Sequence, residues 1–179
     1  GKAYSTSIMR LSTVLVLVIA ILAFPAPALS GAPVSEGSGP EQARIGISFG
    51  GISFMGLIIE YRWGDRSIEM NIGTWTFRDL SASLVGKQYF GPGDFRPFAG
   101  LGRWAVIAPA GDDEEQTGLA ILARAPVGVE WNVDADHHLG AHISLNRGLW
   151  IQRKDPQDDF PPSKRFVPLP GFYYIWNQK

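Results

Sequence analysis

The clearest candidate for catalysis is a histidine and a serine two residues apart, His142 and Ser144. Alternate residues of an extended strand point to the same face, so the imidazole could act as a base for a nucleophilic serine hydroxyl. No acidic residue that would orient His142 is evident on the next strand. The alternative is a pair of polar side chains that only form hydrogen bonds inside the protein.

A second cluster, Asp134, Asp136, His137 and His138, could bind a divalent metal through oxygen and nitrogen ligands. No further ligands accompany it, and aspartate is common in turns, so a solvent-exposed turn is the favoured interpretation. Cysteine is absent, as are the G-x-S-x-G, HExxH, P-loop and dinucleotide-binding motifs. We therefore expect no cofactor and no metal.

The amino-acid composition differs from that of a typical soluble domain. Charged residues make up 18% of the 179 residues and hydrophobic residues 45%. A typical soluble domain has about 25% charged residues. The net charge of −1 and the lack of a basic stripe argue against a nucleic-acid partner.

The N-terminal region has the zones of a secretory signal peptide. Arg10 precedes an apolar run of about 14 residues, 11–24, and small residues follow it. This predicts a signal peptide over residues 1–30. A retained anchor is the alternative, but the run is shorter than the ~20 residues that span a bilayer. Residues 31–43, rich in glycine and proline, are interpreted as a flexible leader, and residues 44–179 as the folded domain.

The folded domain alternates between apolar and polar residues, which is the pattern of β-strands. Met55, Leu57 and Ile59 lie on one face of a predicted strand, and Glu60 and Arg62 lie on the other. A hairpin with an aromatic-rich tip surrounds the turn at Gly91-Pro92-Gly93-Asp94. Eight strands are predicted, at residues 44–50, 53–63, 67–77, 84–90, 95–102, 119–131, 138–149 and 165–176.

The connections alternate in length. Residues 64–66, 91–94 and 132–137 form short turns, whereas residues 108–118 and 152–164 form longer, charged loops. An even number of strands, with short turns at one end and longer loops at the other, is typical of an outer-membrane β-barrel. We therefore predict an all-β, eight-stranded antiparallel up-and-down transmembrane barrel, with the short turns on the periplasmic side.

The aromatic residues fall near the strand ends, as two girdles at the membrane interfaces would require. The predicted periplasmic girdle contains Tyr61, Trp63, Tyr89, Phe90, Phe95, Trp131, Tyr174 and Trp176, and the outer one contains Phe54, Phe77, Trp104 and Trp150.

If the apolar faces contact lipid, the polar faces line the lumen. An eight-stranded barrel has an interior that side chains fill, and buried charges must pair with one another. We therefore predict a charge network that plugs the lumen, in which Lys87 has Glu60, Glu69 and Glu130 as candidate partners. The predicted network contains Glu60, Arg62, Glu69, Lys87, Arg124 and Glu130.

Two segments carry a resemblance to a known family. Residues 87–102 (KQYFGPGDFRPFAGLG) and 124–131 (RAPVGVEW) resemble the small outer-membrane β-barrel proteins, which are porin-like and of the OmpA/OmpX type. The resemblance implies the barrel fold and a location in the outer membrane of a diderm bacterium. It does not imply an activity.

Two alternatives remain open. His142 and Ser144 resemble the H-x-S-N motif of outer-membrane lipid A deacylases, although the asparagine here is Asn146 and the pair faces the predicted lumen. A soluble periplasmic barrel of the lipocalin type would bind a ligand in an apolar interior, and Gly73-Thr74-Trp75 resembles its G-x-W motif. The favoured function is a structural or surface-interaction role, with outer-membrane lipid and an external ligand at loops 108–118 and 152–164 as partners.

Overall fold

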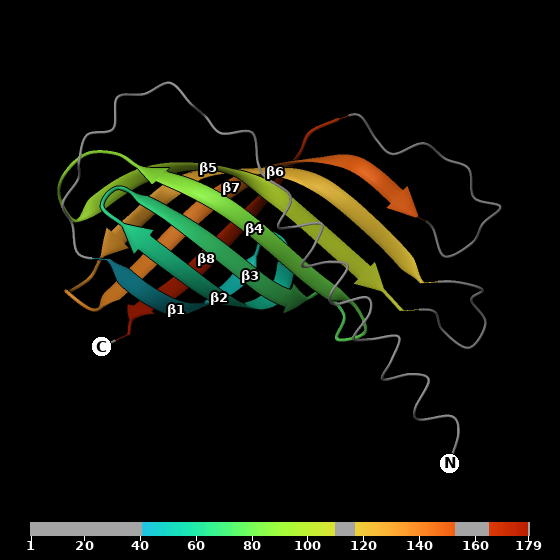
Figure 1. Ribbon diagram of the computed structural model, residues 1–179, viewed down its shortest axis with the longest axis horizontal. Helices are drawn as coiled ribbons and strands as arrows, with labels where there is room; N and C mark the ends of the chain where they lie inside the picture. Colours follow the sequence, from blue (N-terminus) through green and yellow to red (C-terminus); the bar gives the residue numbers. More distant parts are fainter. Residues whose placement is uncertain (1–40, 110–116, 153–164, 179) are drawn as a thin grey trace, which may run out of the picture. The chain divides into compact units, whose positions relative to one another are not determined.

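The computed structural model describes residues 41–109, 117–152 and 165–178. They form a closed antiparallel barrel of eight strands in sequence order, and β8 pairs with β1 to close it (Figure 1). The predicted all-β, eight-stranded antiparallel up-and-down barrel is therefore confirmed. None of the described residues belongs to a helix long and apolar enough to cross a membrane. The strands are β1 (Gln42–Gly50), β2 (Ser53–Trp63), β3 (Arg66–Thr74), β4 (Leu80–Tyr89), β5 (Phe95–Ala108), β6 (Gly118–Asn132), β7 (His137–Gln152) and β8 (Val167–Asn177).

The predicted signal peptide, residues 1–30, lies outside the described residues, as does most of the leader. The same is true of most of the predicted external loops, 108–118 and 152–164.

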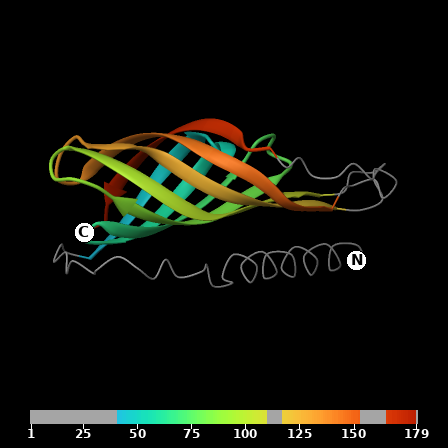
Figure 2. The ribbon, with the colours of Figure 1, turned by 90° about the horizontal axis from the view of Figure 1, so that it is seen from above.

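The two ends of the barrel differ. The turns β2–β3, β4–β5 and β6–β7 lie at one end together with the start of β1 and the end of β8, and we call this the turn end. The other end is the loop end. Strands β5, β6 and β7 are 14, 15 and 16 residues long and extend furthest toward the loop end (Figure 2).

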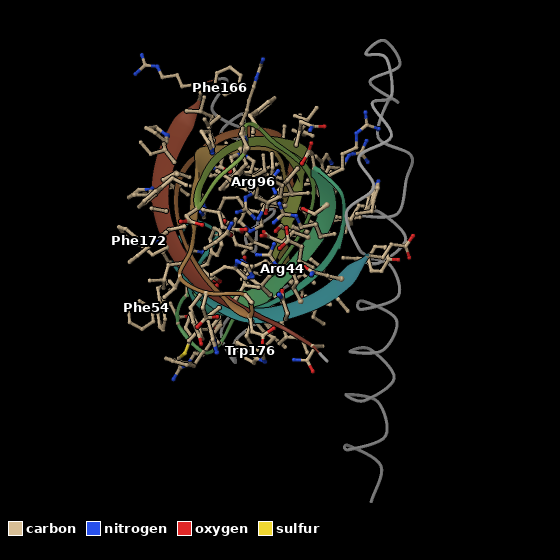
Figure 3. The ribbon with its side chains drawn as sticks, turned by 90° about the vertical axis from the view of Figure 1, so that its left-hand side faces the viewer. Arg44, Phe54, Arg96, Phe166, Phe172 and Trp176 are labelled. Atoms are coloured by element: carbon tan, nitrogen blue, oxygen red, sulfur yellow. The ribbon has the colours of Figure 1, made fainter. Side chains whose placement is uncertain are left out.

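The polarity of the barrel is inverted relative to a soluble protein. Its exterior is apolar, and Figure 3 shows Phe172 and Trp176 pointing away from the barrel while Arg44 lies inside. Met55, Ile59 and Val129 are 40%, 43% and 39% exposed, as their place on the outward face predicts. The buried polar and charged residues include Arg44, Ser48, Glu60, Arg62, Ser67, Glu69, Asn71, Ser81, Ser83, Lys87, Arg124, Glu130, Ser144 and Asn146.

Apolar and aromatic residues complete the interior. The buried cluster consists of Ile58, Tyr89, Phe98, Tyr173 and Ile175. Tyr173 lies directly over the backbone of Gly140, where an added Cβ would be 1.9 Å from the ring. A glycine is needed there because the tyrosine occupies the space that any larger side chain would take.

Three pairs of aromatic residues lie on the outside of the barrel at the turn end, and we call them the aromatic belt. Phe95 and Trp131 stack with ring centroids 5.6 Å apart, and Tyr174 and Trp176 form a second pair at 5.8 Å. Tyr61 and Trp63 form a third pair at 5.9 Å. These six residues were predicted as a girdle, and the structure places them together at one end on β2, β5, β6 and β8.

Two of the residues predicted for the girdles lie inside the barrel instead. Tyr89 is buried, and its hydroxyl donates to Glu60 at 2.9 Å. Trp104 is also buried, and its indole N–H donates to the Ser81 hydroxyl at 2.7 Å. Both positions have inward parity, and both side chains combine a large apolar body with a polar group that finds a partner in the lumen.

The third strand ends earlier than predicted, at Thr74 rather than at residue 77. The carboxylate of Asp79 accepts hydrogen bonds from the amides of Trp75 and Thr76, at 3.0 and 2.9 Å, and from the Thr74 hydroxyl at 2.9 Å. These bonds satisfy the backbone locally and replace the strand pairing. Phe77 has a φ of 61°, a left-handed conformation that is uncommon outside glycine.

The loop at residues 75–79 should respond to acid. Partial burial by itself favours protonation of Asp79, but the hydrogen bonds from Thr76, Thr74 and Trp75 hold the pKa of this carboxyl below its usual value. The stabilisation that the lowered pKa gives the loop is present above about pH 4 and is lost as the pH falls through that pKa. The amide resonances of Trp75 and Thr76 should therefore titrate in NMR spectra with a midpoint below about 3.9.

Asp79→Asn is the matched control and should abolish this titration. A midpoint at or above the ordinary aspartate value would contradict the account of the loop.

Candidate functional site in the barrel interior

Strand register brings charged residues together in the half of the lumen near the turn end. Arg44 on β1 is paired with Glu60 on β2, and Glu60 is paired in turn with Glu69 on β3. Two carboxylates directly opposite each other repel, and they are both buried. Cations from other strands must therefore neutralise them.

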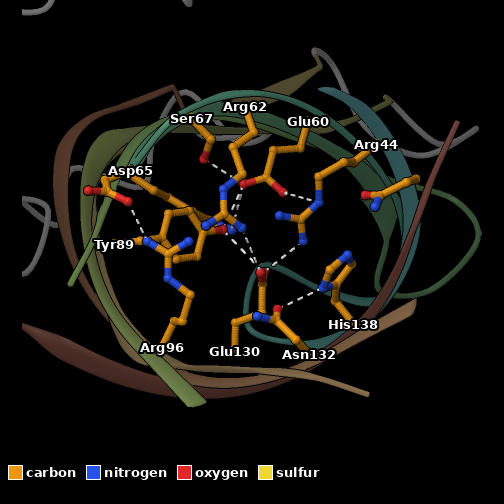
Figure 4. Close-up of polar contacts among 12 residues, drawn as sticks. Arg44, Glu60, Arg62, Asp65, Ser67, Tyr89, Arg96, Glu130, Asn132 and His138 are labelled. Carbon is orange, nitrogen blue, oxygen red and sulfur yellow. Dashed lines mark hydrogen bonds and ion pairs between the residues drawn. The ribbon is translucent and has the colours of Figure 1, made fainter. Parts of the chain in front are cut away.

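Glu130 on β6 is the centre of the network (Figure 4). Its two oxygens accept hydrogen bonds from Arg44 Nη2 at 2.8 Å and from Arg62 Nη1 at 3.1 Å. The hydroxyl of Tyr173 also donates to it, at 3.1 Å. The Glu130 side chain is fully buried, so these donors replace water completely.

Lys87 on β4 separates the two opposed carboxylates. Its ammonium group forms an ion pair with Glu69 and lies 3.7 Å from Glu60 Oε1. Glu60 also accepts a hydrogen bond from the Ser67 hydroxyl at 2.5 Å. The Lys87 Nζ lies 4.9 Å from the centroid of the Phe98 ring and 4.8 Å from that of Tyr173, which adds two cation–π contacts.

The structure thus places five of the six residues of the predicted charge network in two neighbouring ion-paired groups, and Lys87 pairs with two of its three candidate partners. The five are Glu60, Arg62, Glu69, Lys87 and Glu130. Sequence reasoning missed Arg44, which joins Glu60 to Glu130. Its signal was present, because Ile45 and Ile47 are apolar and alternation then turns Arg44 inward.

Arg124, the sixth predicted residue, lies apart from this network. Its guanidinium donates to the hydroxyls of Ser83 at 2.6 Å and Ser144 at 3.2 Å, and among the described residues it forms hydrogen bonds rather than an ion pair. The half of the lumen toward the loop end is therefore built from hydroxyl and amide groups around one cation. In the same half of the lumen, the side-chain amide of Asn71 donates a hydrogen bond to the Ser48 hydroxyl at 3.0 Å.

His142 and Ser144 share the inward face but do not form a base–nucleophile pair. The Ser144 hydroxyl donates to Asn146 Oδ1 at 3.0 Å, and it accepts from Arg124. His142 Nε2 lies 3.5 Å from Arg124, and no hydrogen bond joins His142 to Ser144 in the part of the chain that the structure describes. A hydroxyl that is fully buried and donates to an amide has neither access to a substrate nor a base to take its proton.

The Asp134–His138 cluster is a turn in which the two histidines diverge. Asp134 Oδ1 accepts from the amides of Asp136 and His137, both at 2.8 Å. His137 stacks on Tyr174 outside the barrel, whereas His138 is buried and its Nδ1 lies 2.8 Å from Asn132 Oδ1. Within residues 41–109, 117–152 and 165–178, no group of three His, Cys, Asp or Glu residues is arranged to hold a metal ion.

An open recess of about 530 Å³ lies at the turn end. Arg62 and Arg96 contribute to its wall, and Arg62 also contacts Glu130. Arg96 forms an ion pair with the exposed Asp65 at 2.5 Å. The inner wall of the recess is therefore part of the charge network, which places paired side chains across the lumen beneath this opening.

Removing the central carboxylate should strongly destabilise the barrel. Glu130→Gln leaves the buried Arg62 without its counter-charge and leaves Arg44 with Glu60 alone, and breaking a buried ion pair in this way costs about 3–5 kcal/mol. The matched control is Asp65→Asn, which breaks an exposed pair and should cost at most about 1 kcal/mol. Denaturant unfolding in detergent micelles measures both free energies, and equal, small effects would contradict the central role of Glu130.

Comparisons with known proteins were made at the level of family models, curated proteins and solved structures. None of the three yields a match for this chain.

Proposed function

We propose that the protein is a small outer-membrane β-barrel of a diderm bacterium, with a lumen closed by side chains and a structural or surface-interaction role. The observation that carries this proposal is the inverted polarity of the barrel. A soluble ligand-binding barrel has its polar residues outside and an apolar interior, which is the opposite arrangement.

The apolar exterior favours lipid over water as its surroundings. Large apolar side chains that are more than one-third exposed lie on the outside of seven of the eight strands, all except β4, for example Ile47, Leu57, Ile68, Leu101, Val127, Ile143 and Phe172. Contiguous apolar patches on soluble monomers are rarely larger than a few hundred Å². Burying this surface in hydrocarbon removes it from water without any partner protein.

Backbone closure and strand length support the same proposal. Each strand of the barrel pairs on both sides, which leaves no open sheet edge within the closed part. The strands contain 9 to 16 residues, and about 9–11 tilted residues cross a bilayer. The aromatic belt at the turn end matches the interfacial position of such residues in membrane barrels.

The interior supports a plug rather than a pore. Ion pairs link β1, β2, β3, β4 and β6 across the lumen, and Tyr89, Phe98 and Tyr173 fill the space beside them. Because these side chains fill the lumen, the protein would contact external molecules at its loop end rather than through a channel. We propose that the connections at residues 108–118 and 152–164 present this surface to external ligands.

A charge on the exterior should distinguish a membrane barrel from a soluble one. Leu57 is 47% exposed and lies four residues from Tyr61 of the belt, so Leu57→Arg would place a charge about 10 Å inside the apolar band. Folding into phospholipid vesicles should be weakened by about 2–4 kcal/mol. In a soluble barrel the same exposed change would be nearly neutral.

Phe77→Arg is the control, because Phe77 is 73% exposed on the loop at the loop end. It should change folding into vesicles by less than about 1 kcal/mol. Folding is read from heat-modifiable gel mobility. The same vesicles, loaded with a potassium-sensitive dye, should stay sealed after insertion, and a large, steady ion flux would contradict the closed lumen.

A further inference from the structure

The apolar exterior contains very few charges, and all of them have the same sign. On the outward face of the described strands the charged side chains are three arginines, Arg66, Arg103 and Arg147. Arg66 lies at the turn end. The other two lie on β5 and β7 toward the loop end, and no carboxylate shares the outward face of the described strands with them.

Arg103 and Arg147 occupy one row across three strands. Arg103 is paired with Ala123 on β6, and Ala123 is paired with Arg147. Two strand spacings separate the arginines, which is about 10 Å between their backbones. The methyl group of Ala123 leaves space between them, so both long side chains can reach a single ligand above it.

The depth of this row matches a membrane interface. Ala123 is eight residues from Trp131 of the belt, which is about 26 Å along the strand and about 20 Å of height at a typical barrel tilt. The apolar band of a membrane barrel is about 25 Å tall. Trp150 is paired with Ile121, only two residues further toward the loop end, and is 45% exposed as an interfacial tryptophan would be.

The chemistry of arginine points to phosphate at this depth. Phosphate is the anionic group of a lipid at this depth, and a guanidinium binds its oxygens with two parallel, charge-assisted hydrogen bonds. Arg147 is exposed, and its guanidinium lies 5.7 Å from the ring of Phe166, which orients it by a cation–π contact. Arg103 has a further interaction within the protein, but a guanidinium has five N–H donors and can serve both.

We propose that Arg103 and Arg147 together bind the phosphate group of an anionic lipid in the membrane leaflet at the loop end, with an acyl chain of that lipid packed along Ala123. This binding site rests on the proposed location of the barrel in a membrane. It assigns the row a specific partner, a phosphate-bearing lipid.

The test uses the full chain in nanodiscs of neutral phosphatidylcholine, titrated with diphosphorylated lipid A and, separately, with its phosphate-free form. Native mass spectrometry measures the bound fraction. The variants are Arg103→Gln, Arg147→Gln and the double variant, and Arg66→Gln is the control on the same face at the other end. Heat-modifiable mobility establishes that each variant is folded.

Each arginine near a charged lipid surface contributes about a fivefold change in binding, so the double variant should bind diphosphorylated lipid A about thirtyfold more weakly. Phosphate-free lipid A should bind the wild type and the double variant with similar affinity. The Arg66→Gln variant should bind diphosphorylated lipid A about as tightly as the wild type does. Equal affinities for both lipids, or an equal loss in Arg66→Gln, would overturn the site.

Inorganic phosphate is added in a final arm. If it displaces the lipid at a similar concentration, the site binds phosphate ions and the lipid assignment is wrong. If wild-type protein does not enter nanodiscs at all, the proposed membrane location fails, and with it the lipid site. Insertion without phosphate-dependent binding overturns the site alone.

Discussion

Burial of the Glu130 carboxylate is the constraint on which the interior of this barrel depends. A carboxylate with no water contact must be neutralised and fully hydrogen-bonded, and Arg44, Arg62 and Tyr173 do this from three different strands. These strands reach Glu130 on β6 across the lumen only when the barrel closes. The ion pairs around Glu130 therefore form only in the closed barrel, and they favour the strand register that brings Arg44 and Arg62 to this carboxylate.

The same closure explains the inverted surface. The inward positions of the alternating strands hold the polar side chains that pair with one another, and the outward positions hold most of the large apolar residues. The charge network and the apolar exterior are thus two consequences of one alternation pattern. The proposed lipid surrounding is compatible with both, and in that proposal the aromatic belt at the turn end marks the depth at which lipid begins.

Much of this architecture could be predicted from the sequence, because a period of two fixes which face each residue occupies once a strand is recognised. Leu57 outside and Glu60 inside are examples. Alternation does not fix where a strand ends, since Asp79 satisfies local amides and ends β3 at Thr74. It also does not select ion-pair partners. Glu130 meets Arg44 only through barrel closure, 86 residues away in the sequence.

The most direct test of the account is to find which medium surrounds the exterior of the folded barrel. The chain has no cysteine, so single spin labels can be placed at Ile59→Cys and Val129→Cys in phospholipid vesicles. Paramagnetic resonance should then show high collision rates with oxygen, which dissolves in lipid, and low rates with a water-soluble nickel complex. High accessibility of both labels to the nickel complex in the folded protein would contradict a lipid-facing exterior.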